Sequence, residues 1–167
     1  ACNKDYFSYR NRKNSYIGNS KSKMKDYGCA ISCVSMVFSY HGDRINPGSL
    51  ARKPIFYWDL ISWPGGSGVV GLSGKVKLVQ NTRHSGVSWG TVDKEIGKGN
   101  PVIVFVGAKG KAGHYIVIHG KAKNGKYVVH DPYFGPNLYL DSTMQLLSKL
   151  YSVSISERAI DQMILYR

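Results

Sequence analysis

The feature that most constrains the fold is the run from Ala30 to Tyr40, in which nearly every position is apolar. Its only polar residues are Ser32, Ser35 and Ser39. Because these serines are spaced by three and four residues, they form one narrow stripe along a helix and leave the rest of its circumference apolar. A helix of this kind is normally buried, so residues 29–41 are predicted to form a central helix that ends at Gly42.

The second half of the chain contains short β-branched runs separated by Gly, Lys and Asn, a pattern typical of strands and loops. Strands are predicted over residues 101–106, 114–119, 126–131 and 160–166, and helices over 49–52, 56–62, 89–96 and 142–150. Asn124-Gly125 indicates a two-residue turn between two of the strands. Because helices come first and antiparallel strands follow, the fold class is predicted to be α+β.

Residues 1–28 differ in composition from the rest of the chain, since they are polar and rich in Asn, Ser, Lys and Tyr. They are predicted to form an irregular basic arm. The remaining residues, 29–167, are predicted to form one domain, because a chain of this length buries an ordinary core without further support.

The chain has a formal net charge of +13, from 23 Lys and Arg against 10 Asp and Glu. Such an excess favours anionic partners such as nucleic acid, lipid headgroups or bacterial cell-wall polymers. No helix-turn-helix, RNP or zinc-finger motif accompanies the charge, so nucleic acid is the least favoured of these partners. No apolar run reaches about 20 residues, the length of a membrane span.

Two of the three cysteines lie in the predicted central helix. Cys29 is at its N-terminal end, where unpaired N–H groups and the helix dipole favour a thiolate and lower the pKa of a thiol. Cys33 is one turn deeper and lacks this stabilisation. Cys2 makes the total odd, so the cysteines form no disulfide framework. The alternative is that Cys29 and Cys33 are both buried core residues, which free cysteines often are.

A nucleophilic cysteine needs a base, and His114 is the best placed of the five histidines. It begins a predicted strand, where its side chain can face a cleft, whereas alternation directs His119 to the opposite face. Asp131, at the end of the next strand, is the candidate that orients the imidazole. A two-residue turn, however, places Asp131 opposite Ile118, about 13 Å along the strand from His114.

A bulge, for which Gly120 is the natural position, or a wider loop is needed to bring Asp131 beside His114. The alternative is that residues 131–136 form only a turn. No HExxH, paired CxxC, EF-hand or phosphate-loop motif is present, so neither a metal nor a cofactor is predicted.

Three segments resemble one known family when they are taken in order. These are "GCAISCVSMVFSYHG", "GNPVIVFVGAKGKAGHYIVIHG" and "YVVHDPYFG". They are similar to the nucleophile helix, the strand pair and the Asp-Pro segment of papain-like cysteine peptidases, in the branch of the double-glycine leader peptidases and their secreted relatives. The resemblance covers about residues 25–140 and implies a papain-like fold, with the buried helix packed on an antiparallel sheet.

By this resemblance Cys29 is the nucleophile, His114 the general acid and base, and Asp131 the group that orients the imidazole. The reaction it implies is acyl transfer through a thioester, followed by hydrolysis. One position departs from the family pattern. Papain-like enzymes place a Gln six residues before the cysteine to bind the oxyanion, and this chain has Lys23 there.

The function expected first is a peptidase or peptide amidase that acts on bacterial cell-wall peptide, outside the cell or at the wall, from a bacterium or a phage. The positive charge favours this substrate because wall polymers are anionic. Cleavage of a leader peptide after Gly-Gly is the second expectation. A non-catalytic member of the fold that binds peptide or glycan is the third, which the absent Gln favours and the retained Cys29, His114 and Asp131 oppose.

Overall fold

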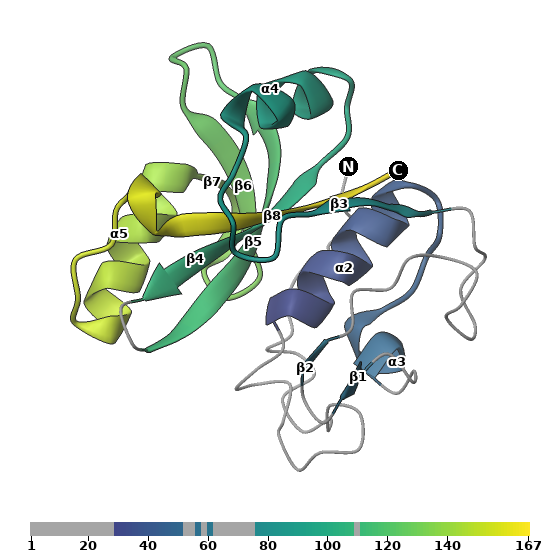
Figure 1. The fold of residues 1–167 in the computed structure, drawn as a ribbon, viewed down its shortest axis with the longest axis horizontal. Coiled ribbons are helices and arrows are strands. Elements are labelled where there is room, and N and C mark those ends of the chain that lie inside the picture. Colours follow the sequence, from purple (N-terminus) through teal and green to yellow (C-terminus); the bar gives the residue numbers. More distant parts are fainter. Residues whose placement is uncertain (1–28, 52–55, 58–59, 62–75, 109–110) are drawn as a thin grey trace. The chain divides into compact units, whose positions relative to one another are not determined.

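The computed structural model describes residues 29–51, 56–57, 60–61, 76–108 and 111–167 (Figure 1). The chain divides into two compact units, one formed by Ala1–Val79 with Tyr166–Arg167 and the other by Gln80–Leu165. The arm predicted over residues 1–28 lies outside the described residues, as does Lys23, so the predicted domain division stays a prediction.

The first unit contains the predicted central helix. Helix α2 (Cys29–Tyr40) is buried throughout residues 30–38, which confirms the prediction made from its apolar circumference. Gly42, at φ 89°, ends the helix. Its N–H donates to the carbonyl of Ser39 at 3.1 Å, and the N–H of Asp43 donates to the carbonyl of Phe38 at 2.9 Å. These two bonds form a Schellman motif, in which a left-handed glycine closes the last turn.

The rest of the first unit is built from short elements. Helix α3 (Pro47–Ala51) follows α2, and β1 (Phe56–Tyr57) pairs with β2 (Leu60–Ile61) in an antiparallel ladder. The helix predicted over residues 56–62 is therefore wrong at its described positions, where the backbone forms paired strands.

A six-stranded sheet with the order β3-β8-β4-β5-β6-β7 contains all four predicted strands. Its strands are β3 (Leu78–Asn81), β4 (Val102–Ala108), β5 (Lys111–Lys121), β6 (Tyr127–Asp131), β7 (Gly135–Tyr139) and β8 (Ile160–Tyr166). The pairs from β8 through β7 are all antiparallel. Together with the helices, this sheet confirms the α+β class and matches the papain-like fold. Strands β3 and β7 had not been predicted.

Two further helices and a single 3-10 turn complete the second unit. They are α4 (Trp89–Gly97), α5 (Leu140–Tyr151) and η3 (Glu157–Ala159). One face of the sheet packs with α4 and α5 in a continuous hydrophobic core. It includes Val104, Ile116 and Met163 from neighbouring strands, with Val92 from α4 and Leu147 from α5. His114 pairs with Val106, which belongs to this core, so the imidazole lies at the end of the covered face.

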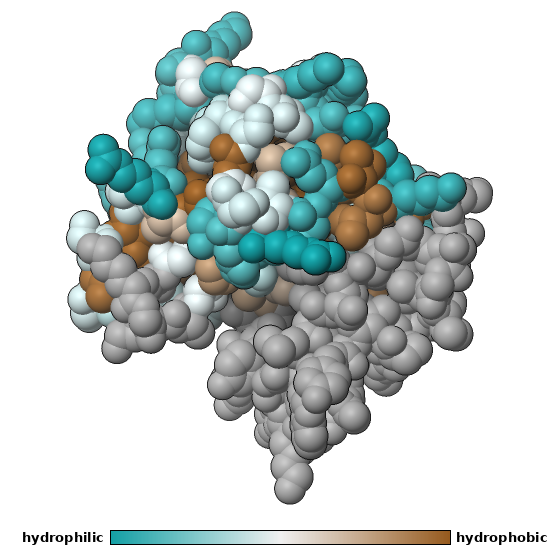
Figure 2. All heavy atoms as spheres, viewed as in Figure 1, coloured by the Kyte–Doolittle hydropathy of each residue, from teal (hydrophilic) through white to brown (hydrophobic). Residues whose placement is uncertain are grey.

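The displayed face of the molecule is mostly hydrophilic over the described residues, and hydrophobic residues show in separate areas (Figure 2). This distribution agrees with a core enclosed by the sheet and its helices. Among the helices that the structure describes, none has the length and apolarity that crossing a membrane requires.

Candidate active site

The separation of about 13 Å that a two-residue turn would leave between His114 and Asp131 is removed by two shifts in strand register. The first lies in the loop between β5 and β6, where the N–H of Ala122 donates to the carbonyl of Lys126 at 2.8 Å. This bond makes the loop three residues long and corrects the predicted two-residue turn. Gly125 is at φ 83°, the left-handed position that such a loop requires.

The second shift is a bulge next to Gly120, the position named for it from the sequence, so both of the predicted alternatives, the bulge and the wider loop, are present. Ile118 pairs with Val129, whereas Gly120 pairs with Val128, so the β5 strand contains one extra residue between these two pairs. The loop and the bulge each move the pairing by one residue in the same direction. Together they place Asp131 level with Ile116, a diagonal neighbour of His114 on the same face, and such diagonal pairs lie within reach of long side chains.

His114 and Asp131 are joined by a buried hydrogen bond. His114 Nε2 lies 2.7 Å from Asp131 Oδ1, and the two residues are 5% and 0% exposed. The ring of Phe134 meets the imidazole edge-on, with 6.4 Å between the ring centroids. The imidazole is therefore held from one side by a carboxylate and flanked by an aromatic ring.

The Asp131 carboxylate accepts hydrogen bonds from three further donors. The backbone N–H groups of Tyr133 and Phe134 donate to Oδ1 at 2.8 and 3.0 Å, and Thr143 Oγ1 donates to Oδ2. Burial raises the pKa of the Asp131 carboxyl, but the hydrogen bond and charge of His114, together with the bonds from Thr143 and Phe134, outweigh burial and hold it below its ordinary value. The carboxylate is therefore ionised at neutral pH.

The Asp131 segment forms a turn, but Asp131 is more than a turn residue, because it also contacts His114. The bonds from Tyr133 and Phe134 make Asp131 the first residue of an Asx-type turn into β7. The same oxygen that stabilises this turn accepts from His114. Thr143 was missed by sequence reasoning, because nothing in the sequence directs a threonine near the start of a helix toward this carboxylate.

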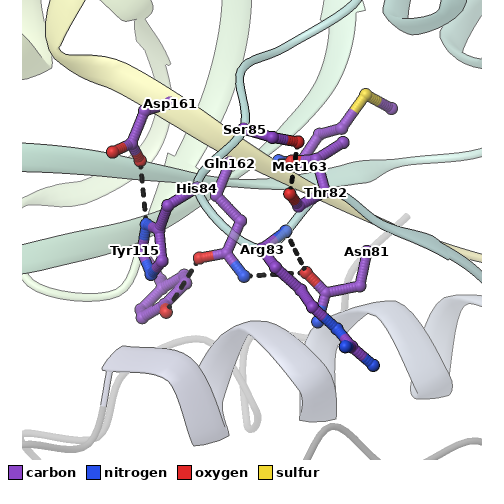
Figure 3. A network of polar contacts seen from close by, with 9 residues as sticks. All are labelled: Asn81, Thr82, Arg83, His84, Ser85, Tyr115, Asp161, Gln162 and Met163. Carbon is purple, nitrogen blue, oxygen red and sulfur yellow. Dashed lines mark hydrogen bonds and ion pairs between the residues drawn. The ribbon is translucent and has the colours of Figure 1, made fainter.

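Tyr115, directly after His114, is hydrogen-bonded on the other face of the sheet. Tyr115 Oη donates to Gln162 Oε1 at 3.2 Å, and Gln162 Nε2 donates to Asn81 Oδ1 at 2.8 Å. Figure 3 shows these three side chains in a row, with the His84 imidazole turned toward Asp161 beside them. Gln162 is 3% exposed, so its buried amide is satisfied by this row.

Gly113, directly before His114, leaves the space that the ring of Phe105 occupies. A Cβ at Gly113 would lie 1.9 Å from Phe105 Cζ. The Phe105 ring also contacts the rings of Tyr115 and His84, with centroid distances of 4.8 and 5.0 Å. The glycine therefore allows an aromatic cluster to cover the strand that carries His114.

Replacing Gly113 with alanine is expected to lower the free energy of unfolding by about 1–2 kcal/mol, because the Phe105 ring has to leave its contacts to make room. Denaturant titration measures this loss. Gly120→Ala is the matched control on the same strand, since its added Cβ meets no atom within 4 Å. Equal stability of Gly113→Ala and the control would contradict the prediction.

Cys29 is the first residue of α2 and is partly exposed, whereas Cys33 is fully buried. Both are present as thiols. Cys29 thus lies at the end of a 12-residue helix where N–H groups and the dipole stabilise a thiolate. Cys33 packs inside the helix core, as expected for a structural cysteine.

A pair of histidines, His119 on β5 and His130 on β6, lies close to this network, and His130 directly precedes Asp131 in sequence. The rings of His119 and His130 stack with 4.1 Å between centroids, and the N–H of Asn137 donates to His130 Nδ1 at 3.2 Å. Burial lowers the pKa of both imidazoles, and the charge of His119 contributes to the shift at His130, whose pKa is lowered to about 4. Within the described ranges, no three His, Cys, Asp or Glu side chains converge as a metal site.

The structure contains an ionised carboxylate that orients a buried imidazole, and Cys29 begins a buried helix. These are the groups that a cysteine hydrolase requires. The comparison with family models agrees with this class. The chain belongs to the Peptidase_C39 like family, whose model matches residues 4–152. The search of curated proteins found no match. Family membership indicates a cysteine peptidase and confirms the papain-like resemblance.

Proposed function

We propose that the chain is a cysteine peptidase or peptide amidase that hydrolyses the peptide of bacterial peptidoglycan, with Cys29 as nucleophile, His114 as general acid and base, and Asp131 as the orienting group. The observation that carries this proposal is the buried 2.7 Å hydrogen bond between His114 and Asp131. Membership of the Peptidase_C39 like family supports it, and so does the place of Cys29 at a helix start.

The hydrogen bond determines which nitrogen of His114 takes part in the chemistry. Because ionised Asp131 only accepts, Nε2 carries the proton of that bond, and proton transfer takes place at Nδ1. The Cys29 thiolate attacks the carbonyl carbon, the imidazolium protonates the leaving amine, and a thioester forms. His114 then removes a proton from water, whose oxygen attacks the thioester, so that the carboxylic acid is released and the Cys29 thiolate and the His114 imidazolium are restored.

The substrate and the location are inferred from charge. A protein with a net charge of +13 is attracted to anionic wall polymers. Several lysines are exposed on the second unit, among them Lys94, Lys98 and Lys123. We therefore place the protein outside the cell or at the wall, as a bacterial or phage-borne enzyme.

Mass spectrometry of digested peptidoglycan tests the proposal. The wild-type chain is expected to release peptide fragments, whereas Cys29→Ala is expected to release none. Cys33→Ala is the matched control, because it makes the same change one turn further along α2, at a buried residue, and it is expected to retain cleavage.

A parallel digestion of a Gly-Gly leader peptide separates the two enzymatic functions. Cleavage of that peptide but not of peptidoglycan would replace the proposed substrate with a leader sequence. Cleavage of neither, together with equally slow alkylation of Cys29 and Cys33 by iodoacetamide at neutral pH, would overturn the enzymatic proposal in favour of a peptide- or glycan-binding protein.

A further inference from the structure

Thr143 contacts the His114–Asp131 pair from a different element. Thr143 lies near the start of α5, is 0% exposed, and donates through Oγ1 to Asp131 Oδ2. A buried hydroxyl needs a partner, and here its partner is an ionised group, which makes the hydrogen bond stronger than one between neutral groups.

The two oxygens of the Asp131 carboxylate have different partners. Oδ1 accepts from His114 and from the N–H groups of Tyr133 and Phe134, and Oδ2 accepts from Thr143. A carboxylate can rotate about its Cβ–Cγ bond, and rotation would change the direction in which Oδ1 points. The bond to Thr143 opposes that rotation because it holds the second oxygen in place.

Helix α5 presents Thr143 from a fixed position. Leu140, Met144 and Leu147 of this helix belong to the same hydrophobic core as Val129 of β6. At the surface, Lys126 Nζ lies 3.0 Å from Asp141 Oδ2, an ion pair that also joins the hairpin to the helix. The packing of the core fixes the position of α5. Because a threonine side chain has few rotamers in a helix, this position also fixes the direction of the Thr143 hydroxyl toward Asp131.

We propose that Thr143 is a positioning residue that holds the Asp131 carboxylate in the orientation in which it accepts from His114 Nε2. The catalytic consequence rests on the proposed function, since it requires His114 to act as the general acid and base. The positioning itself does not, because it is a property of the His114–Asp131 hydrogen bond.

Thr143→Val tests this role, since valine has nearly the same shape and lacks the hydroxyl. The Nε2 proton of His114, followed by NMR in the full chain, is expected to move upfield and to exchange faster with water, because its hydrogen bond lengthens. Hydrolysis is expected to lose about tenfold in kcat with little change in KM. Thr143→Ser, which restores the donor, is expected to recover both the wild-type His114 Nε2 proton and the wild-type kcat.

Thr91→Val is the matched control, because Thr91 is also near a helix start and its Oγ1 donates to Ser88 Oγ at 2.9 Å, outside the site. It is expected to leave the His114 proton unchanged. An unchanged His114 proton in Thr143→Val, or one that Thr143→Ser does not restore, would overturn the proposal. A shifted proton in a chain that hydrolyses nothing would support the positioning role and refute the proposed function instead.

Discussion

Replacing Asp131 with alanine is expected to lower the free energy of unfolding by about 3–5 kcal/mol, which is the usual cost of removing one partner from a buried pair. The Asp131 carboxylate accepts hydrogen bonds from four donors. Asp131 and Thr143 are both 0% exposed. Alanine leaves the buried imidazole and hydroxyl, and two part-buried N–H groups, without this acceptor. Urea or guanidinium titration measures the loss.

The same variant is expected to lose at least about 10²-fold in hydrolysis, the lower end of what a positioned acid or base contributes. Asp131→Asn is the control. Its amide oxygen still accepts from His114, and its NH₂ group meets a Thr143 hydroxyl that can turn to accept. We expect Asp131→Asn to retain most of the stability. A variant Asp131→Ala within about 1 kcal/mol of wild type would contradict the description of the carboxylate as the centre of this network.

The helices of the fold were predictable because their signals are local. The apolar circumference of residues 30–40 predicts α2, and the end of this helix at Gly42 follows from the freedom of glycine to adopt positive φ.

The strands were predicted less completely. Strand β8 was predicted with its observed bounds of Ile160–Tyr166. The strands β3 and β7 were missed because their sequences, LVQN and GPNLY, are short and carry polar residues or Pro and Gly.

The contact between His114 and Asp131 was harder to predict because it depends on register. Asn124-Gly125 is compatible with a two-residue turn, but that turn requires positive φ at both residues, and in this hairpin Gly125 has positive φ and Asn124 does not. Asn124 Oδ1 instead accepts from the N–H of Lys126 at 3.0 Å. The side chain thus favours the three-residue loop, a choice that the dipeptide alone does not reveal.

The bulge beside Gly120 is the necessary complement of that loop. A register shift of one residue turns every side chain to the opposite face of the sheet, so the three-residue loop alone would direct Asp131 away from His114. The second shift, between Ile118 and Gly120, restores the face and brings the carboxylate closer. A chain that kept the His and Asp but lost one of these two irregularities would therefore lose their contact.

Lowering the pH from 6.5 to about 4 is expected to destabilise the fold through buried imidazoles. Burial lowers the pKa of His41, His119 and His130, at His130 to about 4. Between that value and the ordinary 6.5, the unfolded chain binds more protons than the folded chain, so stability falls as the pH falls. For His130 the loss is on the order of 2 kcal/mol after allowance for solvent screening.

Geometry explains why His130 resists protonation. Its Nδ1 accepts from the N–H of Asn137, and a proton there would remove this bond and place a charge against the stacked ring of His119. His130→Gln, which keeps a neutral acceptor, is expected to flatten the pH dependence measured by denaturant titration at pH 4.5 and 7. His84→Gln removes an exposed imidazole as the control. If both variants kept the full wild-type slope, the acid sensitivity would have to arise from groups other than the stacked pair.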